Sequence, residues 1–152
     1  MKRTFGTWAT RLLRGGTTLS EAEHHLLSLL VSELPPRLRE TVETQFDLYN
    51  LVQREVDRRS LNFYRVRIWR GGLLPVTPAL RGKLEVAPLV RLSMKVHGES
   101  KLLHAVLTAV SGHAFSVSFD RAVSRASGPT DYSIEKVTQA WLSNFDEESD
   151  AA

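Results

Sequence analysis

The chain has 152 residues, of which 42% are hydrophobic and 24% are charged, and it contains no cysteine. This composition excludes disordered, fibrous and disulfide-stapled proteins, and a chain of this length can bury an ordinary hydrophobic core. The formal charge is +3, from 20 basic and 17 acidic residues. The lack of thiols excludes disulfides and thiolate metal sites and fits a reducing compartment, so we expect a cytoplasmic location.

Charge is distributed unevenly along the chain. Residues 1–20 hold four basic and no acidic side chains, residues 54–101 hold eleven and four, and residues 120–152 hold three and seven. This asymmetry indicates an anionic partner for the basic region, head-to-tail self-association, or only a solvated surface with an acidic tail. No apolar run approaches the ~20 residues of a membrane-spanning helix, so we expect no integral membrane association.

Helical periodicity dominates the first third of the chain. Residues 1–16 have the pattern of a basic amphipathic arm. A helix from about 20 to 34 is predicted because two overlapping capping boxes, Thr18 with Glu21 and Ser20 with Glu23, precede a leucine-rich stretch, and Pro35-Pro36 ends it. Pro36 can open a second helix, in which apolar residues recur at helical spacing over about five turns. These residues are Leu38, Val42, Gln45, Phe46, Tyr49, Val52 and Val56.

From Ser60 the pattern changes to the alternation of strands, and four strands are predicted. They span Leu61 to Arg70, a stretch following Pro88, Lys101 to Val110, and Ala114 to Asp120. The second strand alternates strictly, which indicates one buried and one solvated face. The third is apolar on both sides, so we expect it at the centre of the sheet.

Two turns set the expected strand pairing. A turn at Gly98-Glu99 places Met94 opposite Leu103 on the buried face. After the third strand, a two-residue turn at Ser111-Gly112 would place Phe115, Val117 and Phe119 on the face of His104. A three-residue loop of residues 111–113 would place them on the buried face instead. We favour the three-residue loop, because it buries the aromatic rings.

The last predicted element is a C-terminal helix, because Ile134, Val137, Trp141 and Phe145 have helical spacing and Asp131 or Ser133 can cap it. The expected fold is therefore α+β, with two or three N-terminal helices, a four-stranded antiparallel meander sheet, and one C-terminal helix. The helices should cover one face of the sheet. The domain organisation is an arm (1–16), a single domain (17–145) and a disordered acidic tail (146–152).

The other face of this predicted sheet is the candidate binding surface. It favours a protein–protein interaction module of the adaptor, chaperone or inhibitor type, since interfaces favour arginine and tryptophan. A nucleic-acid-binding domain using the same basic face is the alternative, because guanidinium groups contact phosphates and rings stack on bases. By strand parity the face carries Arg65, Arg67, Trp69, Arg91, Lys95, His97 and His104.

No catalytic motif is present, so an enzyme is the third alternative, with Tyr49, Tyr64 and His104 as the residues to inspect. Metal ligation is not indicated. His24 and His25 are adjacent and point apart on a helix, and His97 and His104 lie on the order of 13 Å apart along the strands. We expect no catalytic site, metal or cofactor. A homodimer could form through an uncovered sheet edge.

Overall fold

The computed structural model describes residues 19–67, 72–123 and 132–138, which form two helices and a six-stranded antiparallel sheet. The predicted arm (1–16) and acidic tail (146–152) lie outside the described residues. The helices are α2 (Glu21–Ser32) and α3 (Pro36–Leu48). The strands are β1 (Leu51–Arg54), β2 (Ser60–Tyr64), β3 (Val86–Val96), β4 (Leu103–Val110), β5 (His113–Phe119) and β6 (Tyr132–Thr138).

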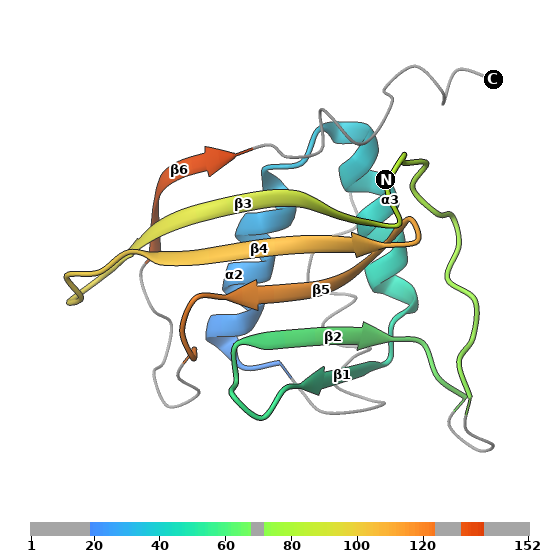
Figure 1. The fold of residues 1–152 in the computed structure, drawn as a ribbon, viewed down its shortest axis with the longest axis horizontal. Helices are drawn as coiled ribbons and strands as arrows, with labels where there is room; N and C mark the ends of the chain where they lie inside the picture. Colours follow the sequence, from blue (N-terminus) through green and yellow to red (C-terminus); the bar gives the residue numbers. More distant parts are fainter. Residues whose placement is uncertain (1–18, 68–71, 124–131, 139–152) are drawn as a thin grey trace.

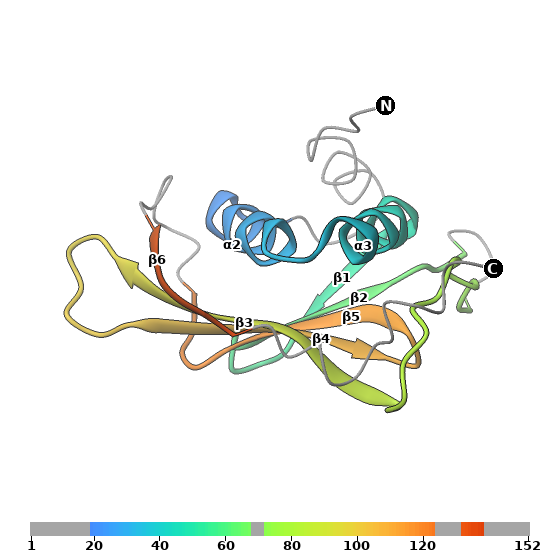
Figure 2. The same ribbon diagram turned by 90° about the horizontal axis from the view of Figure 1, so that it is seen from above.

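The strands lie in the order β1-β2-β5-β4-β3-β6, with both helices on one face (Figure 1, Figure 2). The predicted covering of one face and the central position of β4 are confirmed. The predicted four-stranded meander is wrong, because β2 pairs with β5 and not with β3. In the long connection between β2 and β3, the described residues 80–85 lie against the β4–β5 turn at the end of the sheet. There the Leu80 N–H donates to the Gly112 carbonyl, and the Ser111 N–H donates to the Glu85 carbonyl.

The start of α2 follows its sequence signal. The Ser20 side chain accepts from the Glu23 N–H, and the Glu23 carboxylate accepts from the Ser20 N–H, so the capping box is present. Pro36 opens α3 as predicted. However, α3 ends at Leu48, and the last part of the predicted long helix is the strand β1.

Two contacts explain why the helix ends early. The Asn50 side chain donates to the Val66 carbonyl and accepts from the Val66 N–H, at 2.8 Å each, so it holds the chain beside the segment that follows β2. Val52 is fully buried opposite Phe63 on β2. Val56, which had supported the helical period, is fully exposed in the β1–β2 turn. Its spacing was therefore coincidental.

The first predicted strand is shorter than expected, and its faces are reversed. β2 ends at Tyr64, and its buried residues are Leu61 and Phe63, so Tyr64 lies on the opposite face. Beyond β2, an isolated bridge joins Val66 to Leu73. Arg65 and Arg67 therefore lie in the connection and not on a long strand.

The register of the β3–β4 hairpin was predicted correctly, although its turn was not. Met94 lies opposite Leu103, and the alternation along β3 buries Val90, Leu92, Met94 and Val96. The turn centres on His97-Gly98, because the Glu99 N–H donates to the Val96 carbonyl. Gly98 has φ +82°, which fits the third position of a type II turn. Burial of alternate residues thus determines the register even where the turn differs.

At the β4–β5 hairpin, one of the two predicted arrangements has the correct turn, and the other correctly buries two of the three larger apolar residues of β5. The turn is the two-residue one, and Ser111 and Gly112 both have positive φ, as a type I′ turn requires. A β-bulge after Ala114 then shifts the register by one residue. Val117 and Phe119 are buried as expected, whereas Phe115 lies on the other face, against Tyr64.

The predicted C-terminal helix is wrong within the described residues, because residues 132–138 form β6 along the edge of β3. A bulge at Glu135 places Ile134 opposite Met94 and Val137 opposite Leu92, both against the core. A strand with a bulge therefore reproduces the three-residue spacing of a helix. Trp141 and Phe145 lie outside the described residues.

The core fills the space between the helices and the covered face of the sheet. Its largest fully buried side chains include Phe46, Phe63, Leu26 and Met94. The fully buried amide of Gln45 connects three elements. Its Nε2 donates to the carbonyls of Pro78 (2.7 Å) and Gly112 (3.0 Å), and its Oε1 accepts from the Ala114 N–H (2.8 Å). These bonds attach the long connection and the β4–β5 turn to α3.

Candidate interaction surface

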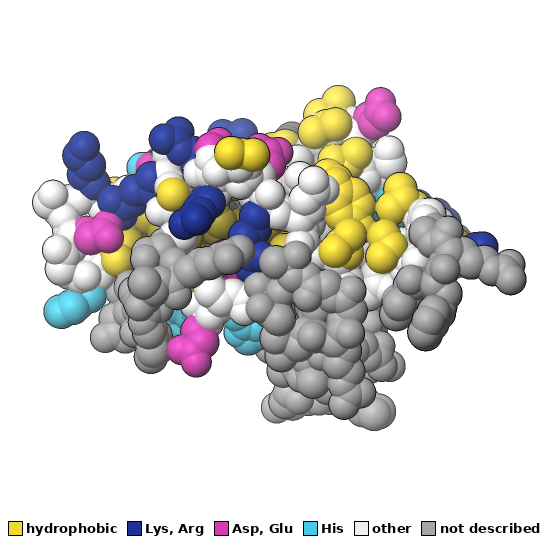
Figure 3. Space-filling view, turned by 90° about the horizontal axis from the view of Figure 1, so that it is seen from below, with side chains coloured by type: hydrophobic (Ala, Val, Ile, Leu, Met, Phe, Trp, Pro, Cys, Tyr) yellow, Lys and Arg dark blue, Asp and Glu magenta, His cyan; other side chains and the backbone are white. Residues whose placement is uncertain are grey.

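The face of the sheet opposite α2 and α3, here called the outer face, is turned toward the viewer in Figure 1 and has neither helix over it (Figure 2). Its two ends differ in chemistry. In Figure 3, where the outer face is at the top, Lys and Arg side chains gather on the half with the β3–β4 turn, and hydrophobic side chains gather on the other half.

The basic end is organised around Ser93 on β3. Ser93 is paired with His104 on β4 and with Lys136 on β6, while Arg91 and Lys95 lie two residues away on the same face of β3. We call these five residues the basic cluster. All but Ser93 are exposed. Their backbones are close, because opposed strand residues are roughly 5 Å apart and alternate residues roughly 7 Å apart.

The charges of the basic cluster are not neutralised within the described part of the chain. Arg91, Lys95 and Lys136 form no ion pair with a described carboxylate. Two carboxylates lie at its edges, Glu135 beside Lys136 and Asp120 beside His104. The Asp120 carboxylate already accepts from the main-chain N–H of His104 at 3.1 Å.

Ser93 and His104 are in direct contact, with 2.8 Å between Oγ and Nδ1. With Asp120 they bring together the three residue types of a hydrolase triad, but the contacts differ from a triad. The Asp120 carboxylate binds the main chain of His104 and not its ring, and the four residues that flank Ser93 are exposed. The pair is better suited to hydrogen-bonding a ligand than to nucleophilic catalysis.

The predicted surface residues are therefore divided by the strand order. Arg91, Lys95 and His104 share the outer face as predicted, and the exposed His97 lies in the adjoining turn. Arg65 and Arg67 lie beyond β2, on the far side of β4 and β5, and the Arg65 guanidinium donates to the Pro75 carbonyl. Trp69 lies outside the described residues.

Two members of the basic cluster were missed by the sequence analysis. Ser93 lies on the same strand alternation as Arg91 and Lys95, so parity alone would have found it. Lys136 had been placed in a helix, and only the bulge in β6 brings it beside Ser93. The role of all these residues in binding stays a prediction.

The apolar end of the outer face is a row of side chains across four strands. It consists of Tyr64 (β2), Phe115 (β5), Val110 (β4) and Val86 (β3). The rings of Tyr64 and Phe115 pack edge to face with centroids 5.2 Å apart. Val86 is 58% exposed, and the neighbouring connection exposes Leu73 (71%) and Leu84 (54%).

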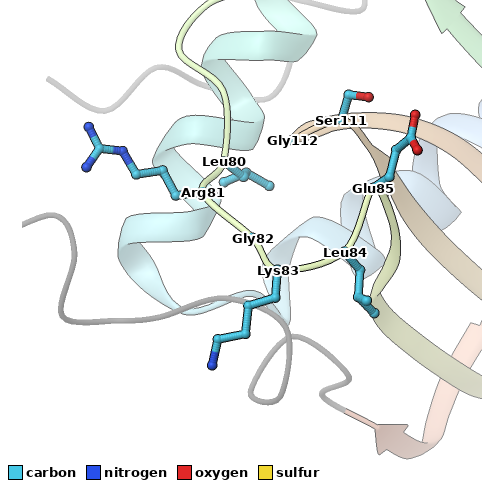
Figure 4. A pocket seen from close by; sticks show the side chains of 8 residues that line it. All are labelled: Leu80, Arg81, Gly82, Lys83, Leu84, Glu85, Ser111 and Gly112. Carbon is cyan, nitrogen blue, oxygen red and sulfur yellow. The ribbon is translucent and has the colours of Figure 1, made fainter.

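A groove of about 450 Å³ lies beside this end, lined by residues 80–85 with Ser111 and Gly112. Figure 4 shows that its charged side chains diverge, since Arg81 and Lys83 point away from Glu85. No histidine lines it, and Ser111 is the one hydroxyl-bearing side chain in its lining. Such a lining offers no paired acid and base.

The residues named for an enzymatic pocket do not converge. The Tyr49 hydroxyl is buried beneath the sheet and donates to the Ala114 carbonyl at 2.6 Å, and burial raises the pKa of this phenol. Tyr64 and His104 lie at opposite ends of the outer face. The described residues contain no group of three His, Asp or Glu side chains that could hold a metal ion.

Comparison with protein-family models, with curated proteins and with solved structures finds no match for the chain. Among the described residues, neither helix is long and apolar enough to cross a membrane.

Proposed function

We propose that this chain is a protein-interaction module, of the adaptor, chaperone or inhibitor type, that binds its partner through the outer face of the sheet. The observation that carries the proposal is the combination, on a face that neither helix covers, of exposed apolar side chains at one end and, at the other, cations that form no ion pair with a described carboxylate. The cytoplasmic location belongs to the same proposal and rests on the sequence alone.

The apolar end supports a protein partner. Val86, Leu73 and Leu84 each expose more than half of their surface, and the Tyr64 and Phe115 rings lie at the same end of the outer face as the paired Val86 and Val110. Exposed apolar patches bordered by polar residues are typical of protein interfaces, where aromatic side chains and arginine are enriched. Folding gains nothing from leaving these groups in water.

The arrangement of the cations is less favourable for nucleic acid. A polynucleotide is bound by cations along a groove, with aromatic rings interleaved to stack on its bases. Here Arg91, Lys95 and Lys136 surround one point, and the Tyr64–Phe115 pair lies on the order of 20 Å away by strand spacing and rise. The two rings also pack edge to face on each other, so one of them already covers a face of the other.

The test is affinity capture from native lysate, with and without nuclease, using the wild-type chain and two charge-reversal variants. Arg91→Glu with Lys95→Glu changes the outer face. Arg37→Glu with Arg59→Glu makes the same change of charge at exposed positions on α3 and in the β1–β2 turn.

We expect a stoichiometric protein that survives nuclease, is retained by the control variant and is lost from the outer-face variant. Equal capture by the two variants would show that the outer face is not the interface. Recovery of nucleic acid would replace the proposal with the nucleic-acid alternative, provided that the logarithm of its binding constant falls linearly with the logarithm of the salt concentration.

A further inference from the structure

The basic cluster has the geometry of a binding site for one compact anion. Ser93 lies at its centre, and His104, Lys136, Arg91 and Lys95 flank it on four sides of the same face. The long side chains of Arg91, Lys95 and Lys136 are exposed and can reach over Ser93. Their positive charges can therefore meet over one point, the Ser93 side chain.

The Ser93–His104 contact adds hydrogen-bond donors at this point. If the Ser93 hydroxyl donates to Nδ1, the ring carries its proton on Nε2 and can donate from there. If Nδ1 donates to the hydroxyl, the hydroxyl hydrogen is free to point at a ligand. In either arrangement the pair keeps one unused donor for an anion, and both side chains are held in place by the 2.8 Å contact.

The two neighbouring carboxylates limit which ligands fit. Asp120 and Glu135 lie at the edges of the cluster, beyond His104 and beside Lys136, so an extended anionic polymer would meet negative charge on either side. A single tetrahedral group above Ser93 can contact the three cations without passing these carboxylates. Phosphate offers such a group, and arginine binds it through two parallel hydrogen bonds.

We infer that the basic cluster binds a phosphorylated serine or threonine side chain of the protein partner. The inference rests on the proposed function, because it names the partner's chemistry at the basic end of the outer face. The apolar end would bind side chains elsewhere in the same partner. Recognition of a phosphorylated segment by a small group of cations is an established way for proteins to read this modification.

The first experiment follows the backbone amide signals of the full-length protein by NMR during titration with inorganic phosphate, against chloride at equal ionic strength. We expect saturable shifts centred on Ser93, His104 and Lys136. The Arg91→Ala and Lys136→Ala variants should each weaken the apparent affinity about tenfold, as expected for loss of a charged hydrogen bond. The control Arg37→Ala should leave it unchanged, and retained signal dispersion shows that each variant is folded.

The second experiment compares a phosphoserine peptide, the same peptide with serine, and a single-stranded RNA oligonucleotide. We expect the phosphoserine peptide to bind more tightly than the serine peptide, with this preference lost in Lys136→Ala. RNA binding that is tighter than phosphopeptide binding and spreads along the whole outer face would overturn the inference. Phosphate shifts no larger than those of chloride, or unchanged in both cluster variants, would overturn it too.

The results separate this inference from the proposed function. If phosphate does not bind but partner capture still depends on Arg91 and Lys95, the interaction surface stands and the phosphate inference fails. If phosphate binds at Ser93 but the outer-face variant captures the partner as well as the control variant does, the anion site stands and the proposed function fails.

Discussion

On the covered face of the sheet, the buried polar residues Glu23 and Gln45 have their partners within the chain, whereas the cations of the outer face have none among the described residues. Glu23 binds both the Ser20 N–H and the Arg54 guanidinium, and Gln45 holds three main-chain groups. Burial without a partner is costly, so folding itself requires the first set of contacts. The outer cations are exposed and carry no such burial cost, and this difference directs the search for function to the outer face.

The largest effect should come where the long connection lies against the β4–β5 turn. Gly112→Ala would place a Cβ 2.3 Å from the Leu80 carbonyl oxygen, at a residue whose φ is +79°. We expect a loss of about 4 kcal/mol in the free energy of unfolding, from left-handed strain together with overpacking. Chemical denaturation measures it.

Gly98→Ala is the matched control for this substitution. Gly98 has a similar φ of +82° but open space around the added Cβ. It should lose only about 1 kcal/mol, the cost of the backbone conformation alone. Equal losses for the two glycines would show that the close approach to Leu80 contributes nothing.

The Glu23–Arg54 pair joins the start of α2 to β1 on the covered face. Its two bonds, of 2.9 and 2.5 Å, lie between side chains that are 5% and 8% exposed. Arg54→Met would leave a buried carboxylate without its partner, at a cost of about 3 kcal/mol. Thermal denaturation of this variant checks the cost.

Adding Glu23→Leu to Arg54→Met should restore part of the lost stability, because the double variant buries no unpaired charge, although it also loses the capping-box bond from the Ser20 N–H. If instead the second substitution adds a further loss of similar size, the charge pair is not what Arg54 contributes to the covered face.

Tyr49 provides a smaller effect that depends on pH. Tyr49→Phe removes the hydrogen bond to Ala114 and should cost about 1 kcal/mol at neutral pH. Burial raises the pKa of this phenol, so the unfolded chain loses the proton first as the pH rises. Stability from this residue is therefore complete below the ordinary phenol pKa, near ~10, and declines above it.

The measurement is the difference in unfolding free energy between wild type and Tyr49→Phe at several pH values. It should be constant from neutral pH to about pH 9 and should shrink above that. A difference that grows with pH would contradict the assigned direction.

Much of the fold was predictable where burial imposes a regular period. The capping box at Ser20, the alternation along β3 and the opposition of Met94 to Leu103 follow from local chemistry and from burial of alternate residues. The β-bulges were not predictable in this way. Each inserts one residue into a strand, which sent Phe115 to the outer face and made β6 resemble a helix.

The candidate site was predictable only where it depends on the alternation of residues along a strand. Arg91, Lys95 and His104 share a face through strand parity and one hairpin register, both of which are local. The place of Lys136 beside Ser93 depends on the bulge in β6. The separation of Arg65 from the basic cluster depends on the pairing of β2 with β5. The pairing of β2 with β5 joins residues more than fifty positions apart in the chain, and no local pattern reports it.

The smallest effect on stability is expected on the outer face. Arg91→Ala, Lys95→Ala and Lys136→Ala should each change the free energy of unfolding by less than about 0.5 kcal/mol, because these exposed side chains make no ion pair with a described residue. The combined variant, measured by the same denaturation, should be as stable as wild type or slightly more stable, since three like charges repel one another. A loss of 2 kcal/mol or more, roughly the size expected for a buried polar contact, would show that folding does use these cations. The contrast between the two faces would then no longer single out the outer face as the place where the protein binds its partner.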